Sequence, residues 1–138
     1  TIELIQMTQA CESLQSAARI FSEGRDSTPV LHVDSILEPE KITLATLSEI
    51  ESLRPFGMGF PAPLFMLENI TASVVPLGQT GEHIRWDTWG KLEIIGFRMA
   101  EYAPIFSQKK AHLIGTLKSH TWRDTITPQF QVVDILIS

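Results

Sequence analysis

The side chains best suited to chemistry in this chain are cations, histidines and tryptophans that gather in its second half. Residues 78–125 hold seven basic side chains against five acidic ones, a net charge of +2, whereas residues 1–63 hold four against nine. Cations can follow a phosphate backbone, and flat side chains can stack on bases for about 1–3 kcal/mol per base. This pattern permits a nucleic-acid-binding face without requiring one, and the expected members of such a face are His83, Arg85, Trp89, Lys91, Arg98, Lys118, Trp122 and Arg123.

The same residue types form no catalytic pattern. Cys11 and the histidines lie in distant segments, and no order of serine, histidine and aspartate suggests a triad. Gly57 and Gly59 are not followed by the glycine and lysine of a phosphate-cradling loop. His32 has no partner at metal-ligand spacing. We therefore expect no catalytic and no metal-binding residue in this chain.

Composition sets the broad class. The chain has 138 residues, 43% of them hydrophobic, which suits one good core or a small domain with a piece of another. The single cysteine fits a reducing cytoplasm, and no apolar run is long enough to span a bilayer. The first residue is Thr1 and no signal peptide is evident, so we expect an excised fragment. The net charge of −5 argues weakly against nucleic acid, and scattered solubilising charge is the simpler explanation of the basic half.

The elements that must position these residues fall into two parts. Apolar residues from Leu4 to Phe21 recur at steps of three and four, which predicts an amphipathic helix that buries Cys11. A strand is expected over residues 29–33 and a second helix over 43–53, with Thr43 as its N-cap. Residues 1–54 are too few for an independent core, so we expect them to be the helical and strand remnant of an upstream region.

A stiff apolar joint follows, over residues 55–65. It holds three prolines, which fix φ, and two glycines, which can adopt φ values that a Cβ forbids. Loops on a surface are usually polar, so this composition predicts a partly buried connection between two structural units. We expect Phe56, Phe60 and Phe65 to be largely buried there, and Gly57 and Gly59 to carry its unusual backbone angles.

After the joint the hydrophobic period changes to that of strands. The pattern predicts strands over residues 64–77, 82–89, 92–99, 111–118 and 129–137, a short helix over 100–106, and a loop over 124–128. This order predicts a mainly β domain with some helix (α+β) over residues 66–138, a five-stranded Greek-key barrel of the OB-fold type. A five-stranded half-sandwich is the competing architecture.

The large aromatic side chains could belong to the core or to a turn and need not stack on bases. Trp86 alternates with polar neighbours, so the core is favoured for it, as it is for Phe97. Trp89 stands beside Gly90 in a turn, where burial and exposure are equally expected. Trp122 lies near a loop, so it either stacks on a base or plugs one end of the barrel.

Dispersed motifs give the chain a family resemblance from about residue 30 to its end. The joint, Pro55-Phe56-Gly57-x-Gly59-x-Pro61-x-Pro63-x-Phe65, resembles the linker of the RecJ family of single-strand-specific DNA exonucleases, which leads from a DHH-associated domain into an OB-fold. Phe60, His120 and Asp124 depart from the family's commonest residues. Three further stretches resemble family elements in the correct order, namely Gly81–Arg85, Ile95–Phe97, and Trp122-Arg123 with Gln129–Ile135.

The resemblance implies a single-stranded-DNA-binding module of a 5′–3′ exonuclease, a cytoplasmic nuclease and hydrolase of DNA repair and recombination. It implies Mn²⁺ or Mg²⁺ for the parent's catalytic domain, whose Asp-His-His and Gly-Gly-His motifs this chain lacks. The partners it implies are single-stranded DNA and the rest of the same polypeptide. Two alternatives stay open: a scaffold that packs on the catalytic core, and an OB-fold that binds RNA or sugar.

Overall fold

The computed structural model describes residues 30–88, 90, 92–106 and 109–137. These residues belong almost entirely to one compact unit, His32–Ser138, and the account below concerns that unit alone. The expected N-terminal helix with Cys11 lies outside the described residues. The described part of the chain has no helix long and apolar enough to cross a membrane.

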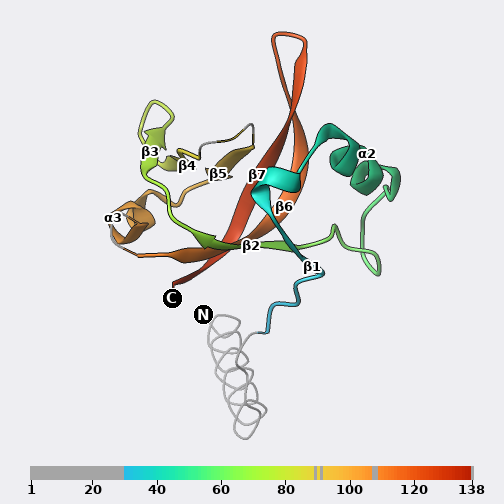
Figure 1. The fold of residues 1–138 in the computed structure, drawn as a ribbon, viewed down its shortest axis with the longest axis horizontal. Coiled ribbons are helices and arrows are strands. Elements are labelled where there is room, and N and C mark those ends of the chain that lie inside the picture. The colour runs from blue at the N-terminus through green and yellow to red at the C-terminus, as the bar shows by residue number, and fades with distance from the viewer. Residues whose placement is uncertain (1–29, 89, 91, 107–108, 138) are drawn as a thin grey trace, which may run out of the picture. The chain divides into compact units, whose positions relative to one another are not determined.

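Seven strands form one twisted sheet around the core (Figure 1). Their spatial order is β1-β2-β6-β7-β5-β4-β3, with parallel pairing between β1 and β2 and between β5 and β7 and antiparallel pairing elsewhere. The strands are β1 (Ser35–Leu37), β2 (Phe65–Ile70), β3 (Val74–Leu77), β4 (His83–Trp86), β5 (Glu93–Gly96), β6 (Ala111–Trp122) and β7 (Thr125–Ile137).

The predicted OB-fold is confirmed, in an open form. β2 and β3 lie far apart in the strand order, yet only residues 71–73 join them, so the sheet must curl back on itself. No ladder joins β3 to β2 within the described residues, and the sheet stays unclosed. The strand expected over 64–77 is therefore two strands. Asn69 adopts a left-handed φ of +54° at an irregularity in the β2–β6 register, which interrupts the extended backbone there.

The core lies on the inner face of this sheet. Its largest fully buried side chains are those of Trp86, Phe130, Leu67, Ile84, Ile94 and Leu113. Trp86 packs edge-on against Phe106, with ring centroids 5.1 Å apart, so the core position predicted for Trp86 is confirmed. Phe106 belongs to α3 (Ala103–Phe106), which follows the 3₁₀ turn η2 (Ala100–Tyr102), and both lie within the helix predicted over 100–106.

The helix predicted over 43–53 is confirmed as α2 (Leu44–Ser52). Thr43 caps it: its hydroxyl oxygen accepts from the Thr46 amide at 3.3 Å, and the Thr46 hydroxyl accepts from the Thr43 amide at 3.4 Å. Leu47 is the helix's buried residue, and the helix contacts β6 and β7. The 3₁₀ turn η1 (Pro39–Lys41) leads into it.

The strand expected up to residue 33 is wrong in position, because pairing begins two residues later. Asp34 forms two hydrogen bonds with Leu64. The Asp34 carboxylate accepts one from the Leu64 amide at 2.8 Å, and the Asp34 amide donates the other to the Leu64 carbonyl at 2.8 Å. This clamp sets Ser35 opposite Phe65 and so places β1. Tertiary pairing, rather than the β-branched composition of the preceding residues, thus decides where the strand lies.

The joint is less buried than its composition predicts. Gly57 and Phe60 exchange backbone hydrogen bonds of 2.8 and 3.1 Å, and the turn between them points Met58 into solvent. Phe60 is 52% exposed and only leans on the half-buried Phe56, with ring centroids 5.9 Å apart. The expected burial of Phe60 is therefore wrong, while Phe65 is buried in β2. Gly59 has a φ of +86°, but Gly57 has no positive φ, and the Arg54–Pro55 peptide bond is cis.

A long hairpin replaces the loop expected over 124–128. β6 and β7 stay paired to the last possible residue, Trp122 opposite Thr125, around a two-residue turn. Arg123 and Asp124 have φ values of +46° and +61°, as a type I′ turn requires, and this turn type matches the twist of a hairpin. Pro128 is tolerated because β5 pairs with β7 only from Gln129 onward, which leaves β7 an open side at the proline.

Candidate nucleic-acid interface

The outer face of the sheet brings together several of the predicted binding residues. The register places Arg85 of β4 opposite Ile95 of β5, and Ile95 opposite Gln131 of β7. Lys118 of β6 lies opposite Gln129 on the same face, and His120 and Trp122 follow it at alternate positions. Arg85 points away from the core because its neighbours along β4, Ile84 and Trp86, are buried in it, and Lys118 follows the buried Leu117. From Ser119 to Trp122 the strand has left the core, and no residue there is buried.

A groove of about 940 Å³ runs between β4 and the end of the β6–β7 hairpin. We call it the hairpin groove. It is lined by the predicted residues Arg85, Trp122 and Arg123, and also by His120 and Thr127. Asp87 and Glu93 contribute acidic groups to its wall. The groove therefore combines two permanent cations with an aromatic ring and two carboxylates.

Trp122 stands at the tip of the hairpin and is 66% exposed. It does not plug the barrel. Base stacking, the other role considered for it, stays a prediction. The Arg123 guanidinium lies 5.6 Å from the centre of the indole ring, a cation–π distance. Most of the indole surface nevertheless remains exposed to solvent.

The carboxylate of Glu93 is held by neutral and weakly basic partners rather than by the arginines. The Gln129 amide donates to it at 2.9 Å, and Nδ1 of His120 lies 3.3 Å from the same oxygen. Gln131 in turn donates to the Gln129 side chain at 2.8 Å. No carboxylate of the described residues forms an ion pair with Arg85 or Arg123. Both cations thus keep their charge available in the groove.

Two further predicted residues, His83 and Arg98, do not line the hairpin groove. Nδ1 of His83 accepts a hydrogen bond from the Arg98 amide at 3.0 Å, and the His83 ring meets Phe97 edge-on at 5.3 Å. Arg98 lines a separate hollow together with Glu82 and Glu101, whose charges disfavour an anion. Phe97 is 49% exposed, so the favoured core position for it is wrong. Trp89 and Lys91 lie outside the described residues.

Lys118 lines a third hollow, which we call the joint hollow, of about 290 Å³. Arg54 and Phe56 from the joint region and Thr116 from β6 also line it. Arg54 was not among the predicted binding residues, and neither was Thr127 of the hairpin groove. The alternating threonines of β7 could have indicated the latter, had residues 124–128 not been expected to form a loop.

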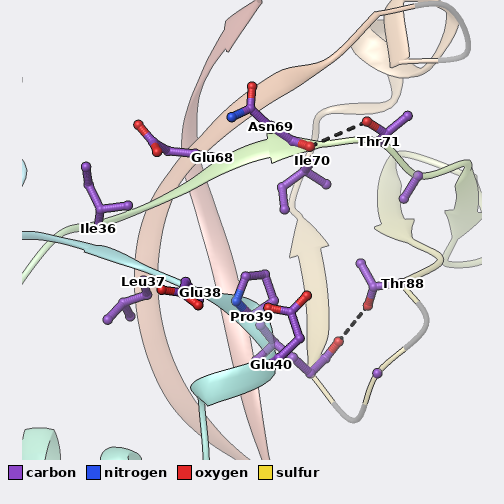
Figure 2. Close-up of a pocket in the computed structure, with 13 residues that line it drawn as sticks. Ile36, Leu37, Glu38, Pro39, Glu40, Glu68, Asn69, Ile70, Thr71 and Thr88 are labelled. Atoms are coloured by element: carbon purple, nitrogen blue, oxygen red, sulfur yellow. Dashed lines mark hydrogen bonds between the residues drawn. The ribbon is translucent and has the colours of Figure 1, made fainter.

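A fourth hollow, of about 580 Å³, has the opposite character. Figure 2 shows Glu38, Glu40 and Glu68 around it, over apolar residues that include Leu37 and Ile70. Its acidic rim disfavours a polyanion. The described residues contain no group of three or more histidine, cysteine, aspartate or glutamate side chains that could hold a metal ion. These residues therefore do not fit a catalytic metal centre.

The curled sheet, with a groove between β4 and the hairpin, defines an OB-fold domain. The chain belongs to the family described as the RecJ OB domain, which matches residues 33–134. A curated relative is the single-stranded-DNA-specific exonuclease RecJ of Bacillus subtilis (strain 168), 27% identical over 144 residues. The match takes in 96% of this chain but 18% of that protein, so the chain corresponds to under a fifth of the relative.

Two solved structures share the fold. RecJ from Thermus thermophilus in complex with Mn²⁺ superposes with a TM-score of 0.62 at 22% identity, over 77% of this chain and 16% of that one. The same protein in complex with Mg²⁺ gives a TM-score of 0.56 at 24% identity, over 76% and 16%. The OB-fold of this chain is thus the fold of one part of RecJ, whose structures hold divalent metal ions.

Proposed function

We propose that this domain binds single-stranded DNA and guides it to the catalytic core of a RecJ-like 5′–3′ exonuclease. The hairpin groove is the binding site. Arg85 and Arg123 neutralise phosphates, and Trp122 stacks on a base. The parent protein is then a cytoplasmic hydrolase of DNA repair and recombination whose Mn²⁺ or Mg²⁺ is held by a domain other than this one. Residues 1–54 continue an upstream DHH-associated region, and residues 55–65 join it to the domain over 66–138.

The observation that supports this proposal most is the pairing of unsatisfied charge with an exposed aromatic ring. Arg85 and Arg123 line one groove, and neither makes an ion pair with a described carboxylate. Trp122 lies in the same groove, mostly exposed. Proteins that hold single strands without reading their sequence combine cations with flat side chains, and the groove supplies Arg85, Arg123 and Trp122 beside the carboxylates of Asp87 and Glu93.

A salt titration tests the proposal. We expect a fluorescent oligothymidylate to bind the 138-residue chain at low salt, with an affinity that falls as salt rises, and a duplex of equal length to bind more weakly. Arg85→Gln should lower the slope of the log–log plot by about 0.7, the value of one single-strand phosphate contact. Lys41→Gln is the matched control. Lys41 does not line the groove, and its ammonium group is paired with the Glu38 carboxylate at a distance of 2.8 Å.

Two results together would contradict single-strand binding by this domain. The chain would bind no oligonucleotide at low salt, and charge reversals of Arg85 and Lys91 would leave the parent exonuclease unaffected. Preferential binding of an RNA oligomer or a sugar over DNA in competition would likewise replace single-stranded DNA as the ligand.

A scaffold function is the second candidate, and the distribution of charge favours it. Arg85, Arg98 and Lys118 line three different hollows, and the chain carries a net charge of −5. On this proposal the exposed Met58 and Phe60 pack on the rest of the polypeptide. Replacing both with serine would then weaken association with the parent's catalytic core while oligonucleotide binding stays unchanged.

A further inference from the structure

The joint hollow carries two cations that no described carboxylate neutralises. Arg54 and Lys118 both line it, and neither forms an ion pair among the described residues. On α2, the Glu51 carboxylate accepts a hydrogen bond from the Ser119 hydroxyl at 3.0 Å and is thereby engaged. Two positive charges from separate elements thus share one small hollow, a suitable place for a phosphate.

An aromatic side chain lies beside these cations. Phe56 lines the joint hollow, and the Arg54 guanidinium lies 5.3 Å from the centre of its ring. Phe60, which is half exposed and does not line the hollow, packs on Phe56 with ring centroids 5.9 Å apart. The hollow therefore repeats, on a smaller scale, the combination of Arg123 and Trp122 at the hairpin tip.

The two sites lie along one strand. Trp122 and His120 of the hairpin groove and Lys118 of the joint hollow occupy alternate positions of β6, on its outer face. Four residues of a strand span about 13 Å. At about 3.4 Å per stacked nucleotide, that distance corresponds to roughly four nucleotides. The length agrees with the smallest sites that single OB-folds use, of about 4 nucleotides.

We propose that the joint hollow is a second subsite for the same nucleic-acid strand, with a phosphate held between Arg54 and Lys118 and a base against Phe56. The proposal rests on single-strand binding in the hairpin groove, which it extends. A strand that enters at Trp122 passes over Lys118 and leaves past the joint. The joint is then a binding element in addition to a connection.

Oligonucleotide length separates the two sites. We would measure anisotropy of oligothymidylates of about 2, 8, 12 and 16 nucleotides with the whole chain, because the shortest cannot span the roughly four nucleotides between the two sites. Arg54→Gln and Lys118→Gln should each weaken the longer oligomers about fivefold and lower their salt slope by about 0.7, with the shortest oligomer unchanged. Phe56→Leu should cost the longer oligomers at least about fivefold, through lost stacking. Lys41→Gln removes an equal charge outside both sites and should change nothing.

The outcomes distinguish the subsite from the groove. If the shortest and the longer oligomers bind but Arg54→Gln and Lys118→Gln leave every affinity and slope unchanged, the joint hollow is not a subsite and the groove stands alone. If the unmodified chain binds no oligomer, the proposed function fails and the subsite fails with it. Arg54 and Lys118 are exposed, so these two variants test the idea even if Phe56→Leu unfolds the domain.

Discussion

Truncation of the hairpin-tip tryptophan, Trp122→Ala, separates binding from folding. The side chain is 66% exposed and has the Arg123 guanidinium 5.6 Å from its ring centre, so its removal should change the free energy of unfolding by no more than about 0.5 kcal/mol. Its stacking on a base is worth about 1–3 kcal/mol. A loss of this size weakens the affinity for a single strand by a factor of about 5 to 150.

Fluorescence anisotropy with an oligothymidylate, in parallel with urea unfolding, measures both quantities. Trp122→Phe should restore most of the affinity, because a flat ring is kept while the indole N–H is lost. Ile126→Ala is a matched control: Ile126 is 53% exposed near the same tip but lies opposite Thr121, on the other face of the hairpin. Equal losses from Trp122→Ala and Ile126→Ala would refute the stacking argument, as would an unchanged affinity for Trp122→Ala.

The remaining predictions concern stability and are checked by urea unfolding. Gly115→Ala should cost about 1–3 kcal/mol or more, because a Cβ there would collide with the backbone carbonyl of Gln131 across the β6–β7 ladder. Thr43→Ala should cost about 1 kcal/mol through loss of the α2 cap, and Thr43→Ser should recover most of it. Phe60→Ser should cost under about 0.5 kcal/mol and Phe65→Ala about 3–5, so similar losses would contradict the burial described for the joint.

Periodicity predicted the parts of the fold that local patterning decides. Thr43 before an apolar stripe gave the start of α2, and alternation around Trp86 gave the inner face of β4. Both features depend on residues close in sequence. The OB-fold followed because the order of strands and helix restricts the topology strongly.

The sequence patterns did not predict features that depend on distant residues or on unusual backbone angles. β1 owes its position to Asp34 and Leu64, which are 30 residues apart. Phe97 leaves the core because β5 ends at Gly96 and Arg98 turns the chain with a φ of +55°. The hairpin turn at Arg123–Asp124 uses positive φ without a glycine, so the usual composition of such a turn was absent.

The candidate site was only partly predictable, because residue type can be read from the sequence whereas the grouping of distant residues cannot. Residue type singled out Arg85, Trp122 and Arg123, which share one groove. It could not indicate that Arg98 would share a hollow with Glu82 and Glu101. Nor could it single out Arg54, which lines the same hollow as Lys118 only in the folded domain, where the segment after α2 lies beside β6.

The length of the β6–β7 hairpin gives the hairpin groove two unlike walls. Among the described residues, β5 pairs with β7 no further than Gln129 and β2 pairs with β6 no further than Gly115, so residues 119–128 form a two-stranded ribbon with free edges. A ribbon of two strands has little stability by itself, whereas β4 belongs to the sheet that surrounds Trp86. The ribbon is held mainly by its own ladder, with Ser119 bonded to Glu51 and His120 beside Glu93. Under the proposed single-strand binding, this wall would adjust to the nucleic acid while β4 stays fixed in the sheet around the core.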